Sequence, residues 1–531
     1  MELYCHRGWM LTFKNQKKKK MSNQTSDNNK RIAKNTGMLY VRMLFMMVIS
    51  LYTSRITLNA LGVVDYGIYN VIGGVVATMA FVKTTLSSAA QRFITFELGR
   101  NNMESLKKVF SNILSIHLIF GGIVLLVGET LGVWFLNTQM NIPSDRMMAA
   151  NVVLQCSLGI FILTLMNVPY NGLIIAHERM NAFAYISILE VVLKLLIVYA
   201  LLIVSVDKLI LYSFLWLCTF ILIQFVYFQY SFKNFSESRI RPQYDRRLCK
   251  KMLGFSGYNL CEVFANMLAD QGLNILLNLH FGPAINAARG IAVQVNGAIN
   301  GFTTNFITAV NPQITKSYAS GDSARMWTLV NYGNRLAFFL LLFLATPVFF
   351  KIDYILEVWL KTPPVYCAIF IQMMILINLN IMPKRTFYTA VSATGDIKRY
   401  QISFGLFRLL VFPACWIVLN YISSNPNSVY VVLLAFEIIG TAVSMKIVKD
   451  KMPDFSILNY IKVVLWPCTY VFCIVFCVQF FFSKIFSDNL GSLILYAFLA
   501  CIINAIIIYV IGLNKKEKNI IHELIKRKVK K

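Results

Sequence analysis

The amino-acid sequence predicts an all-α integral membrane protein with fourteen transmembrane helices. Of its 531 residues, 57% are hydrophobic and only 14% are charged, whereas soluble domains are about 45–50% apolar. A single water-soluble core would leave many of these apolar side chains on the surface. Apolar runs long enough to cross a bilayer, about 20 residues each, recur along the chain. The eleven cysteines form no C-x-x-C pair and lie mostly inside these runs, so a disulfide scaffold is excluded.

Short polar segments separate the apolar runs and set the helix boundaries. In chain order we expect helices at 38–60, 67–96, 109–136, 147–176, 181–204, 209–232, 252–280, 284–312, 330–350, 365–391, 400–421, 428–448, 460–483 and 490–513. Interpreted as domains, the chain has a basic cytoplasmic tail (1–36), a first lobe of six helices (37–232), a basic linker (233–251), a second lobe of six helices (252–449), two further helices (450–513) and a basic amphipathic tail (514–531).

The two tails carry expectations of their own. Met21 follows the run Lys17–Lys20 and opens a polar stretch, so it is a candidate for the true start. The first apolar run is too long for a cleavable signal peptide. The segment 514–531 alternates apolar residues with lysines. This pattern fits either a helix lying on the anionic inner leaflet or a solvated basic tail.

The distribution of basic residues predicts that both ends of the chain are cytoplasmic. With this orientation the tails and inner loops hold most of the lysines and arginines, as the positive-inside rule requires. The net charge of +27 is therefore mainly an orientation signal, which argues against a nucleic-acid partner. The outer segments hold only Arg146, Lys208, Lys351, Lys361 and Lys484.

Matching residues occur in the same order in the two predicted lobes. At an offset of 220 residues, Gly37 falls on Gly257 and Gly62 on Gly282, and later, at an offset of 214, Pro169 falls on Pro383. Because each copy has six helices, both copies have the same orientation and are related by a pseudo-twofold axis along the membrane normal. Transporters built in this way bind their substrate between the two halves, near the middle of the membrane.

Two helices at equivalent places in the repeat each have a polar face. The helix at 67–96 carries Asn70 on a face of small and polar residues, and the helix at 284–312 carries Arg289, Asn296 and Asn300 along one face. Such faces are also typical of helix packing through small residues and interhelical hydrogen bonds. We expect them to line a shared aqueous cavity that binds the substrate.

Polar residues recur every four positions in the helix at 252–280. A carboxylate among amide oxygens is a plausible site for a coupling proton or sodium ion, since hard cations prefer oxygen ligands. The alternative is that Asp270 pairs with a cation across the cavity. The residues of this row are Glu262, Asn266, Asp270, Asn274 and Asn278.

Cations outnumber anions inside the predicted helices. Charged groups in the bilayer cost about 2.5–3.5 kcal/mol each on insertion scales, so they face a cavity or a partner. Glu190 and Lys194 are four residues apart and are expected to pair, while Arg92 and Arg335 are expected to reach the inner surface. The excess of cations over anions predicts a cavity that binds an anion such as phosphate. The cations are Arg42, Arg55, Lys83, Arg289, Lys384, Arg385 and Arg408, against the anions Glu129, Glu262, Asp270 and Glu437.

The sequence lacks the motifs of several enzyme classes. It contains no Walker A sequence, no H-E-x-x-H motif and no Cys/His metal cluster. The longest outer loop, near 351–364, is short for a membrane glycosyltransferase or polymerase. We therefore expect a protein that is not an enzyme, with no cofactor beyond a coupling proton or sodium ion.

Two stretches carry a resemblance to a known family. The segment Leu61 to Tyr69, followed by Ser87 to Arg92, resembles the N-terminal signature of bacterial polysaccharide transporters, and Asn167 to Met180 resembles the helix 4–5 junction of that family. These are flippases of O-antigen and capsule precursors, related to multidrug and toxin extrusion exporters and to the lipid II flippase. The resemblance implies two six-helix lobes and a cationic cavity. It places Arg55 and Arg289 at substrate-binding positions and Asp270 at a position of coupling acids.

The sequence therefore predicts a flippase for an oligosaccharide linked to polyprenyl diphosphate, in the bacterial cytoplasmic membrane. Arg42, Arg55, Lys83 and Arg289 would attract the phosphates. The expected partners are this lipid, the membrane lipids and the polysaccharide polymerase machinery. A cation-coupled multidrug exporter of the related branch and a membrane glycan polymerase or ligase are the alternatives.

Overall fold

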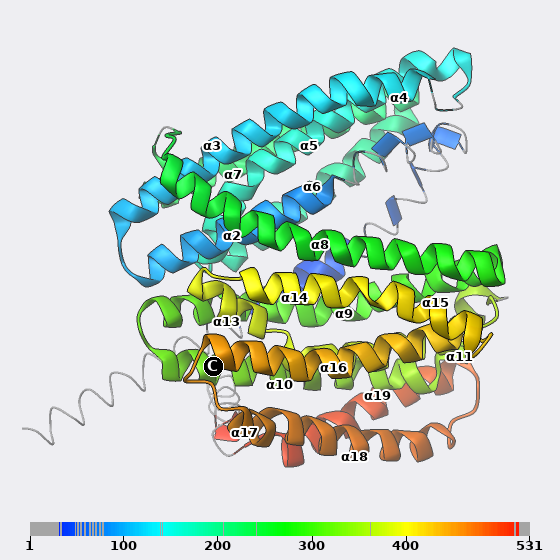
Figure 1. The fold of residues 1–531 in the computed structure, drawn as a ribbon. Helices are drawn as coiled ribbons and strands as arrows, with labels where there is room; N and C mark the ends of the chain where they lie inside the picture. Colours follow the sequence, from blue (N-terminus) through cyan, green and yellow to red (C-terminus); the bar gives the residue numbers. More distant parts are fainter. Residues whose placement is uncertain are drawn as a thin grey trace, which may run out of the picture.

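The computed structural model describes most of the chain as helix (Figure 1). The described residues are 31, 34–47, 49, short groups between 52 and 76, and 79–519 without 139, 141, 205, 241, 362, 515 and 516. Among these residues every regular element is helical, which confirms the predicted all-α class. The expectations for Met21 and for the tail beyond residue 519 lie outside the described residues.

The observed helices follow the predicted ones closely. Residues 34–47 are helical where the first helix was expected, and only the second half of the next helix is described without gaps. The elements are α2 (Ala80–Gly99), α3 (Met103–Val127), η1 (Gly128–Gly132), α4 (Val133–Thr138), η2 (Ser144–Arg146), α5 (Met147–Ala176), α6 (Met180–Ile203), α7 (Lys208–Asn234), η3 (Ser236–Ser238), α8 (Arg246–Phe281), α9 (Pro283–Ala319), α10 (Ser323–Phe350), α11 (Ile352–Leu360), α12 (Cys367–Ile381), η4 (Met382–Lys384), α13 (Phe387–Thr394), α14 (Lys398–Leu409), α15 (Val411–Tyr421), α16 (Asn427–Lys451), α17 (Ile457–Tyr460), η5 (Ile461–Leu465), α18 (Trp466–Ser483), α19 (Leu490–Ile507) and η6 (Ile508–Gly512).

Ten helical segments of the described chain are long and apolar enough to cross a membrane. The chain is therefore a multi-pass membrane protein. α8 and α9 are not among the ten although they have 36 and 37 residues. Both carry rows of polar and charged side chains that lower their hydropathy, and these rows form much of the candidate site below.

Polar residues just before the helices fix where several of them begin. The Asn102 side chain accepts a hydrogen bond from the Ser105 backbone N–H at the start of α3, and Asp322 caps α10 in the same way. At the start of α7, Asp207 accepts from the N–H groups of Leu209 and Ile210. Such caps satisfy backbone donors that have no partner inside the helix.

The helices pack as two bundles with a pair of helices at one side. The first bundle contains α2, α3, α5, α6 and α7, and the second contains α9, α10 and α12–α16. α8 packs on α14 and α15 of the second bundle and also on α2 and α3 of the first. α18 and α19 pack on α10 (Figure 1).

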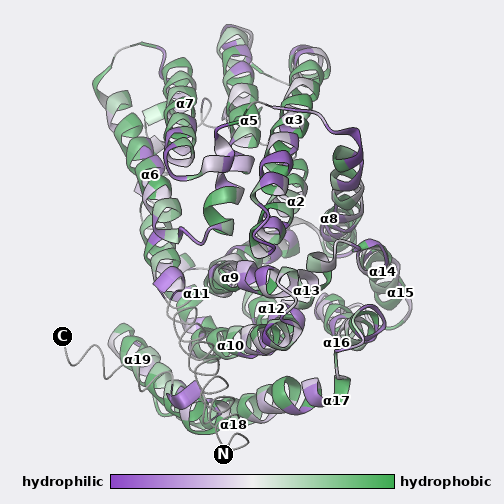
Figure 2. Cartoon of the chain, turned by 90° about the vertical axis from the view of Figure 1, so that its left-hand side faces the viewer, coloured by the Kyte–Doolittle hydropathy of each residue, from purple (hydrophilic) through white to green (hydrophobic). Residues whose placement is uncertain are grey.

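The two bundles meet at one end of the molecule and diverge toward the other. In Figure 1 the turns after α2, α9 and α13 lie together at the left, whereas α4 and α15 lie far apart at the right. The left-hand end carries most of the basic turn residues, among them Arg100, Arg179, Arg325 and Lys398, and we call it the basic end. Figure 2 looks onto this end.

Large apolar side chains cover the outer faces of the helices. On α18 and α19, Trp466, Phe481 and Phe498 are each about two-thirds exposed, and Figure 2 shows these helices as mainly hydrophobic. A water-soluble protein rarely exposes such a surface. Beneath it, Gln479 donates to Asn504 and Asn504 donates to Thr346 of α10 (2.9 and 2.7 Å), so a buried polar network attaches both helices to the second bundle.

Six of the eight described residues with positive φ form three pairs at a nearly constant spacing. Gly62 and Gly282 have φ of 78° and 77°, and they lie 220 positions apart. Asn101 and Gly321 repeat that spacing, while Glu178 and Gly395 are 217 positions apart. Left-handed turns at matching places support the internal repeat that the sequence suggested.

Candidate functional site

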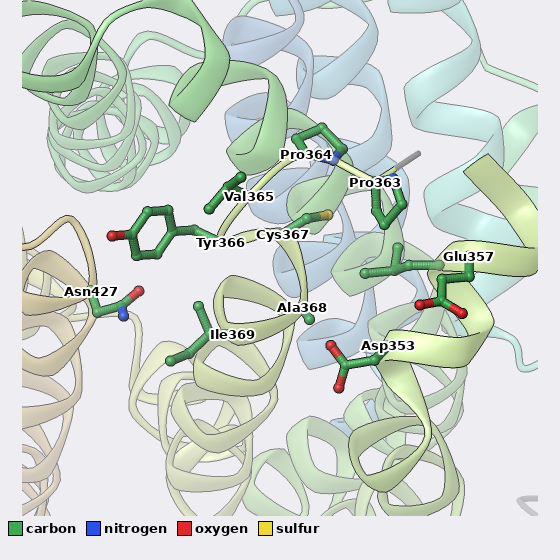
Figure 3. A pocket seen from close by; sticks show the side chains of 11 residues that line it. Asp353, Glu357, Pro363, Pro364, Val365, Tyr366, Cys367, Ala368, Ile369 and Asn427 are labelled. Carbon is green, nitrogen blue, oxygen red and sulfur yellow. The ribbon is translucent and has the colours of Figure 1, made fainter. Parts of the chain in front are cut away.

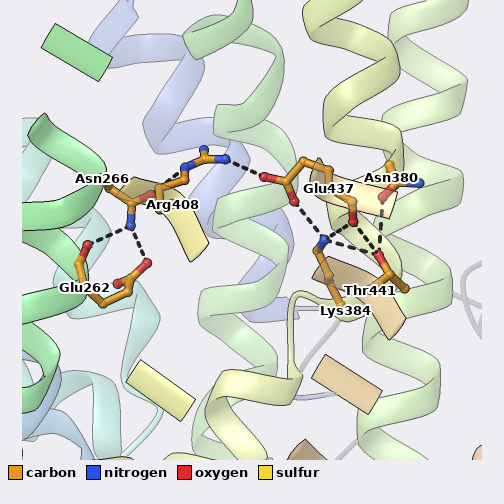
Figure 4. Close-up of polar contacts among 7 residues, drawn as sticks. All are labelled: Glu262, Asn266, Asn380, Lys384, Arg408, Glu437 and Thr441. Atoms are coloured by element: carbon orange, nitrogen blue, oxygen red, sulfur yellow. Dashed lines mark hydrogen bonds and ion pairs between the residues drawn. The ribbon is translucent and has the colours of Figure 1, made fainter. Parts of the chain in front are cut away.

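A chain of charged contacts crosses the second bundle from α8 to α16 (Figure 4). Asn266 on α8 donates to the Glu262 side chain and accepts from Arg408 Nε at 2.8 Å. Arg408 Nη1 pairs with Glu437 Oε1 at 2.6 Å, and Lys384 Nζ pairs with Glu437 Oε2 at 2.7 Å. Lys384 also donates to Thr441 (3.2 Å). Glu437 therefore uses both carboxylate oxygens to hold two cations.

A second group lies farther along α8. Arg289 of α9 donates to Asp270 Oδ1 at 2.8 Å and to Asn274 Oδ1 at 2.7 Å. The Arg289 side chain is only 5% exposed, whereas the Asp270 side chain is 65% exposed. The predicted row on α8 is thus divided between two cations, and Asp270 pairs with one of them.

A cavity of about 260 Å³ connects the two groups. Asn266 and Arg408 line it from the first group and Asp270 from the second, and Leu433 of α16 closes it with other apolar residues. The amide and the charged groups give this cavity a polar wall inside a helix bundle. A small polar or charged group can therefore enter it beside Arg408 and the Asp270 carboxylate.

The first bundle contains a different arrangement of charge. Arg42, Lys83 and Lys194 all lie near the single carboxylate of Glu190 and interact with it electrostatically. The Arg42 guanidinium lies 4.2 Å from the centre of the Phe183 ring, and its buried Nε has no hydrogen-bond partner. The expected close Glu190–Lys194 ion pair does not form. Three cations therefore share one carboxylate in this part of the described chain.

Amide side chains fill the interface between α9 and α12. Asn296 accepts hydrogen bonds from Asn378 and from Asn300 (3.3 Å to the latter). Asn300 Oδ1 is buried without a partner. The predicted polar face of α9 is thus partly used in helix packing. Arg55, Asn70 and the side chain of Asn278 lie outside the described residues.

Two sets of contacts join the bundles at the basic end, and we call them the closing contacts. Arg92 of α2 donates to the carbonyl oxygens of Ser392 and Ala393, both at 2.9 Å. Glu178, in the turn after α5, accepts from Gln313 and pairs with Lys316 of α9, both at 2.6 Å. Glu178 has a side chain only 1% exposed. These buried bonds hold the first bundle against the second.

The expectation that Arg92 and Arg335 reach the membrane surface is wrong. Arg92 is 7% exposed and Arg335 is 5% exposed. Arg335 forms a buried ion pair with Glu517 just after the last helix. The partners of both arginines lie far from them in the sequence, so the sequence alone gives no signal for these contacts. The role of Glu178 was missed for the same reason.

The opposite end has a cavity of a different kind (Figure 3). It has a volume of about 350 Å³ and lies between α11 and the segment that leads into α12. Asp353 and Glu357 of α11 border it, together with Pro363, Pro364 and other mostly apolar residues. The described residues that line it include no lysine or arginine. Within the described residues, no three His, Cys, Asp or Glu side chains come together as a metal site.

Several solved structures of transporters have the same fold as this chain. A scan against protein-family models finds no match, and a search of curated proteins finds none. A crystal structure of MATE in the straight conformation matches with a TM-score of 0.66 and 15% identity, covering 80% of this chain and 95% of that chain. An outward-facing multidrug resistance MATE family transporter of the MOP superfamily gives 0.65 and 14%, covering 79% and 97%.

A third structure adds a contrast in charge. It is a MOP superfamily transporter from Pyrococcus furiosus, with a TM-score of 0.62 and 14% identity over 79% of this chain and 95% of that chain. For that protein, a binding pocket of reverse polarity is described as suggesting a different function. At such identities the likeness concerns the fold. This multi-pass membrane protein has the fold of MATE transporters of the MOP superfamily.

Proposed function

We propose that the chain is a flippase for an oligosaccharide linked to polyprenyl diphosphate, in the bacterial cytoplasmic membrane. The observation that carries the proposal is the cation surplus around Glu190. Arg42, Lys83 and Lys194 all interact electrostatically with one carboxylate, which balances only one of their three charges, and an arginine binds phosphate oxygens well in a site shielded from water. A diphosphate would supply the missing negative charge.

The proposed mechanism is alternating access between two lobes, which correspond to the first bundle and to the second bundle with α8. The recurring left-handed turns support this division, and the positive-inside rule assigns the basic end to the cytoplasm. The closing contacts would break to admit the headgroup from that side and re-form behind it. The isoprenoid chain would remain in the lipid throughout.

A multidrug exporter of the related branch is the alternative. Its cavity should be acidic or apolar to suit cationic drugs, whereas the first bundle has more cations than anions around Glu190. The proton or sodium coupling predicted for Glu262, Asn266, Asp270 and Asn274 stays part of the proposal. Transport that is independent of pH and of sodium would contradict that part.

A flipping assay tests the proposal. The purified chain is reconstituted in liposomes with a fluorescent oligosaccharide on polyprenyl diphosphate, and headgroup accessibility is followed over time. Arg42→Gln/Lys83→Gln is compared with Lys208→Gln/Lys484→Gln, which removes two exposed cations at the opposite end. We expect the first variant to lose at least about tenfold in rate, as when one charge-assisted contact is lost, and the control to keep its rate. Equal rates in both variants would contradict the proposed site.

A further inference from the structure

Without any substrate, Arg289 is already paired with an anion, the carboxylate of Asp270. Its three acceptors all come from α8, namely Asp270 Oδ1 at 2.8 Å, Asn274 Oδ1 at 2.7 Å and the Asp270 carbonyl at 3.5 Å. Because Arg289 is only 5% exposed, it would be costly to leave its charge unpaired. The Asp270 carboxylate therefore occupies the position that any anionic ligand of Arg289 would take.

The two side chains of this pair differ in exposure. The Asp270 side chain is 65% exposed, and it binds Arg289 through only one of its two carboxylate oxygens. Glu437 offers the contrast within the same bundle. Its side chain is 13% exposed, and each of its oxygens binds a different cation. Asp270 can thus leave Arg289 and become hydrated at low cost, whereas Glu437 cannot leave its two partners.

The surroundings leave room for a replacement. Asp270 borders the cavity of about 260 Å³ that Asn266 and Arg408 also line. A guanidinium forms the same paired hydrogen bonds with a phosphate as with a carboxylate. A diphosphate carries more charge than one carboxylate, so it can compete for Arg289 from the side that Asp270 leaves open. Asn274 would keep the guanidinium oriented during the exchange.

We propose that Asp270 is a built-in competitor for Arg289, and that a diphosphate group binds Arg289 by displacing it. The inference rests on the proposed function for its ligand class. It makes Asp270 a residue that sets specificity. A weakly charged ligand does not displace the carboxylate, whereas a diphosphate does.

Binding measurements on the purified full-length chain test this exchange. Inorganic pyrophosphate and farnesyl diphosphate are titrated calorimetrically into wild type, Asp270→Asn, Asp353→Asn and the double variant Asp270→Asn/Arg289→Gln. Asp353 is an exposed carboxylate on α11 beside the other cavity, so its variant is a control for a general loss of negative charge. We expect Asp270→Asn to bind about tenfold more tightly than wild type, which corresponds to about 1.4 kcal/mol. Asp353→Asn should bind with the affinity of wild type, and the double variant should not bind more tightly than wild type.

A second variant keeps the test decisive if Asp270→Asn does not fold. Asn274→Asp adds another carboxylate beside Arg289, so it should weaken diphosphate binding. A gain with both probes means that the diphosphate alone is recognised, and a gain with farnesyl diphosphate only means that the lipid headgroup is required. Unchanged binding in Asp270→Asn, an equal gain in Asp353→Asn, or no binding to any variant would overturn the proposal. Tighter binding by Asp270→Asn, together with no flipping by the wild-type chain in liposomes, would instead contradict the proposed function alone.

Discussion

One arginine connects three segments of the chain at the end opposite the closing contacts. Arg146 Nε donates to Asp65 at 2.8 Å, and Arg146 Nη1 donates to Asp207 at 2.6 Å. Asp207 also caps α7. Burial raises the pKa of Asp207, but the hydrogen bond from Arg146 and those from the cap outweigh it, so this pKa lies below its ordinary value. The contacts of Arg146 are therefore expected to weaken when Asp207 becomes protonated.

The variant Arg146→Gln should therefore show a stability loss that depends on pH. A carboxyl group with a lowered folded-state pKa stabilises the fold above its unfolded pKa of about 3.9, and the stabilisation is lost as the pH falls through the folded value. We expect a loss of about 1–2 kcal/mol at neutral pH, which shrinks below about pH 4. Thermal unfolding in detergent across this range measures it, with Arg146→Lys as the control that keeps the charge. A difference in stability between wild type and Arg146→Gln that does not change with pH would contradict this role of the Arg146–Asp207 contact.

Residue positions on α8 show what sequence spacing can and cannot predict. The repeat of polar residues every four positions predicted one row facing one site. A step of four residues advances the side chain about 40° around a helix, so a row of this length turns toward different neighbours. Asn266, which also binds Glu262, consequently meets Arg408 of α14, while Asp270 and Asn274 meet Arg289 of α9. The composition of the site was readable from the sequence, whereas its partners depend on helix packing.

At the scale of helices, α2 and α9 approach each other most closely at the basic end. A Cβ atom added to Gly99 would lie 2.7 Å from the Ala319 Cβ and 2.9 Å from the Lys316 Cα. Neither atom is the end of a flexible side chain, so a larger residue has to push the helices apart. Gly395 is constrained in a different way, because its φ is +83°, a conformation that residues with a Cβ rarely adopt, and an added Cβ would also lie 2.7 Å from Arg92 Nη2.

Gly99→Val should accordingly destabilise the closed basic end. Overpacking of this kind costs about 1–3 kcal/mol, and we expect a lower unfolding temperature. Gly122→Val on α3 is the matched control, because a Cβ there would meet nothing within 4 Å. Differential scanning calorimetry of both variants measures their unfolding temperatures. The interpretation fails if the two substitutions have the same effect.

Helix boundaries were predictable where apolar runs end in polar turns. The predicted range 147–176 coincides with α5 (Met147–Ala176). α8 instead begins at Arg246, before the predicted residue 252, because its first turns are basic and amphipathic and extend beyond the apolar run. Breaks within helices were not predicted. The π-helical turn at Gly128–Gly132 lies in the middle of an apolar segment that has no proline.

For the molecule as a whole, the closing contacts decide which end is shut. They join α2 to the last turn of α13, and α9 to the turn after α5, so the two bundles contact each other in a reciprocal way. Glu178 and Gly395, which follow α5 and α13, share a left-handed backbone and lie 217 positions apart. A small polar cavity of about 50 Å³ remains between the bundles beside Arg92.

Exchanging the charges of one closing contact tests this role. Glu178→Lys or Lys316→Glu alone places like charges together, so each should open the basic end, whereas Glu178→Lys/Lys316→Glu restores the pair. The readout is maleimide labelling of a cysteine placed at Gln91, which lines the small polar cavity. Mass spectrometry resolves this site from the native cysteines. We expect labelling at least about tenfold faster in the single variants, equivalent to about 1.4 kcal/mol of population shift. Labelling that remains fast in the double variant would argue against the closing contacts.

The central claim is that the chain moves a negatively charged, lipid-linked headgroup outward. An inside-negative membrane potential favours that movement by about 2.3 kcal/mol per charge per 100 mV, and it opposes the export of a cation. The most direct measurement is the initial flipping rate of the lipid-linked oligosaccharide in liposomes, with the potential set by a potassium gradient. The account predicts flipping that accelerates as the interior becomes more negative. No flipping at any potential, together with efflux of a cationic dye from the same liposomes, would contradict it.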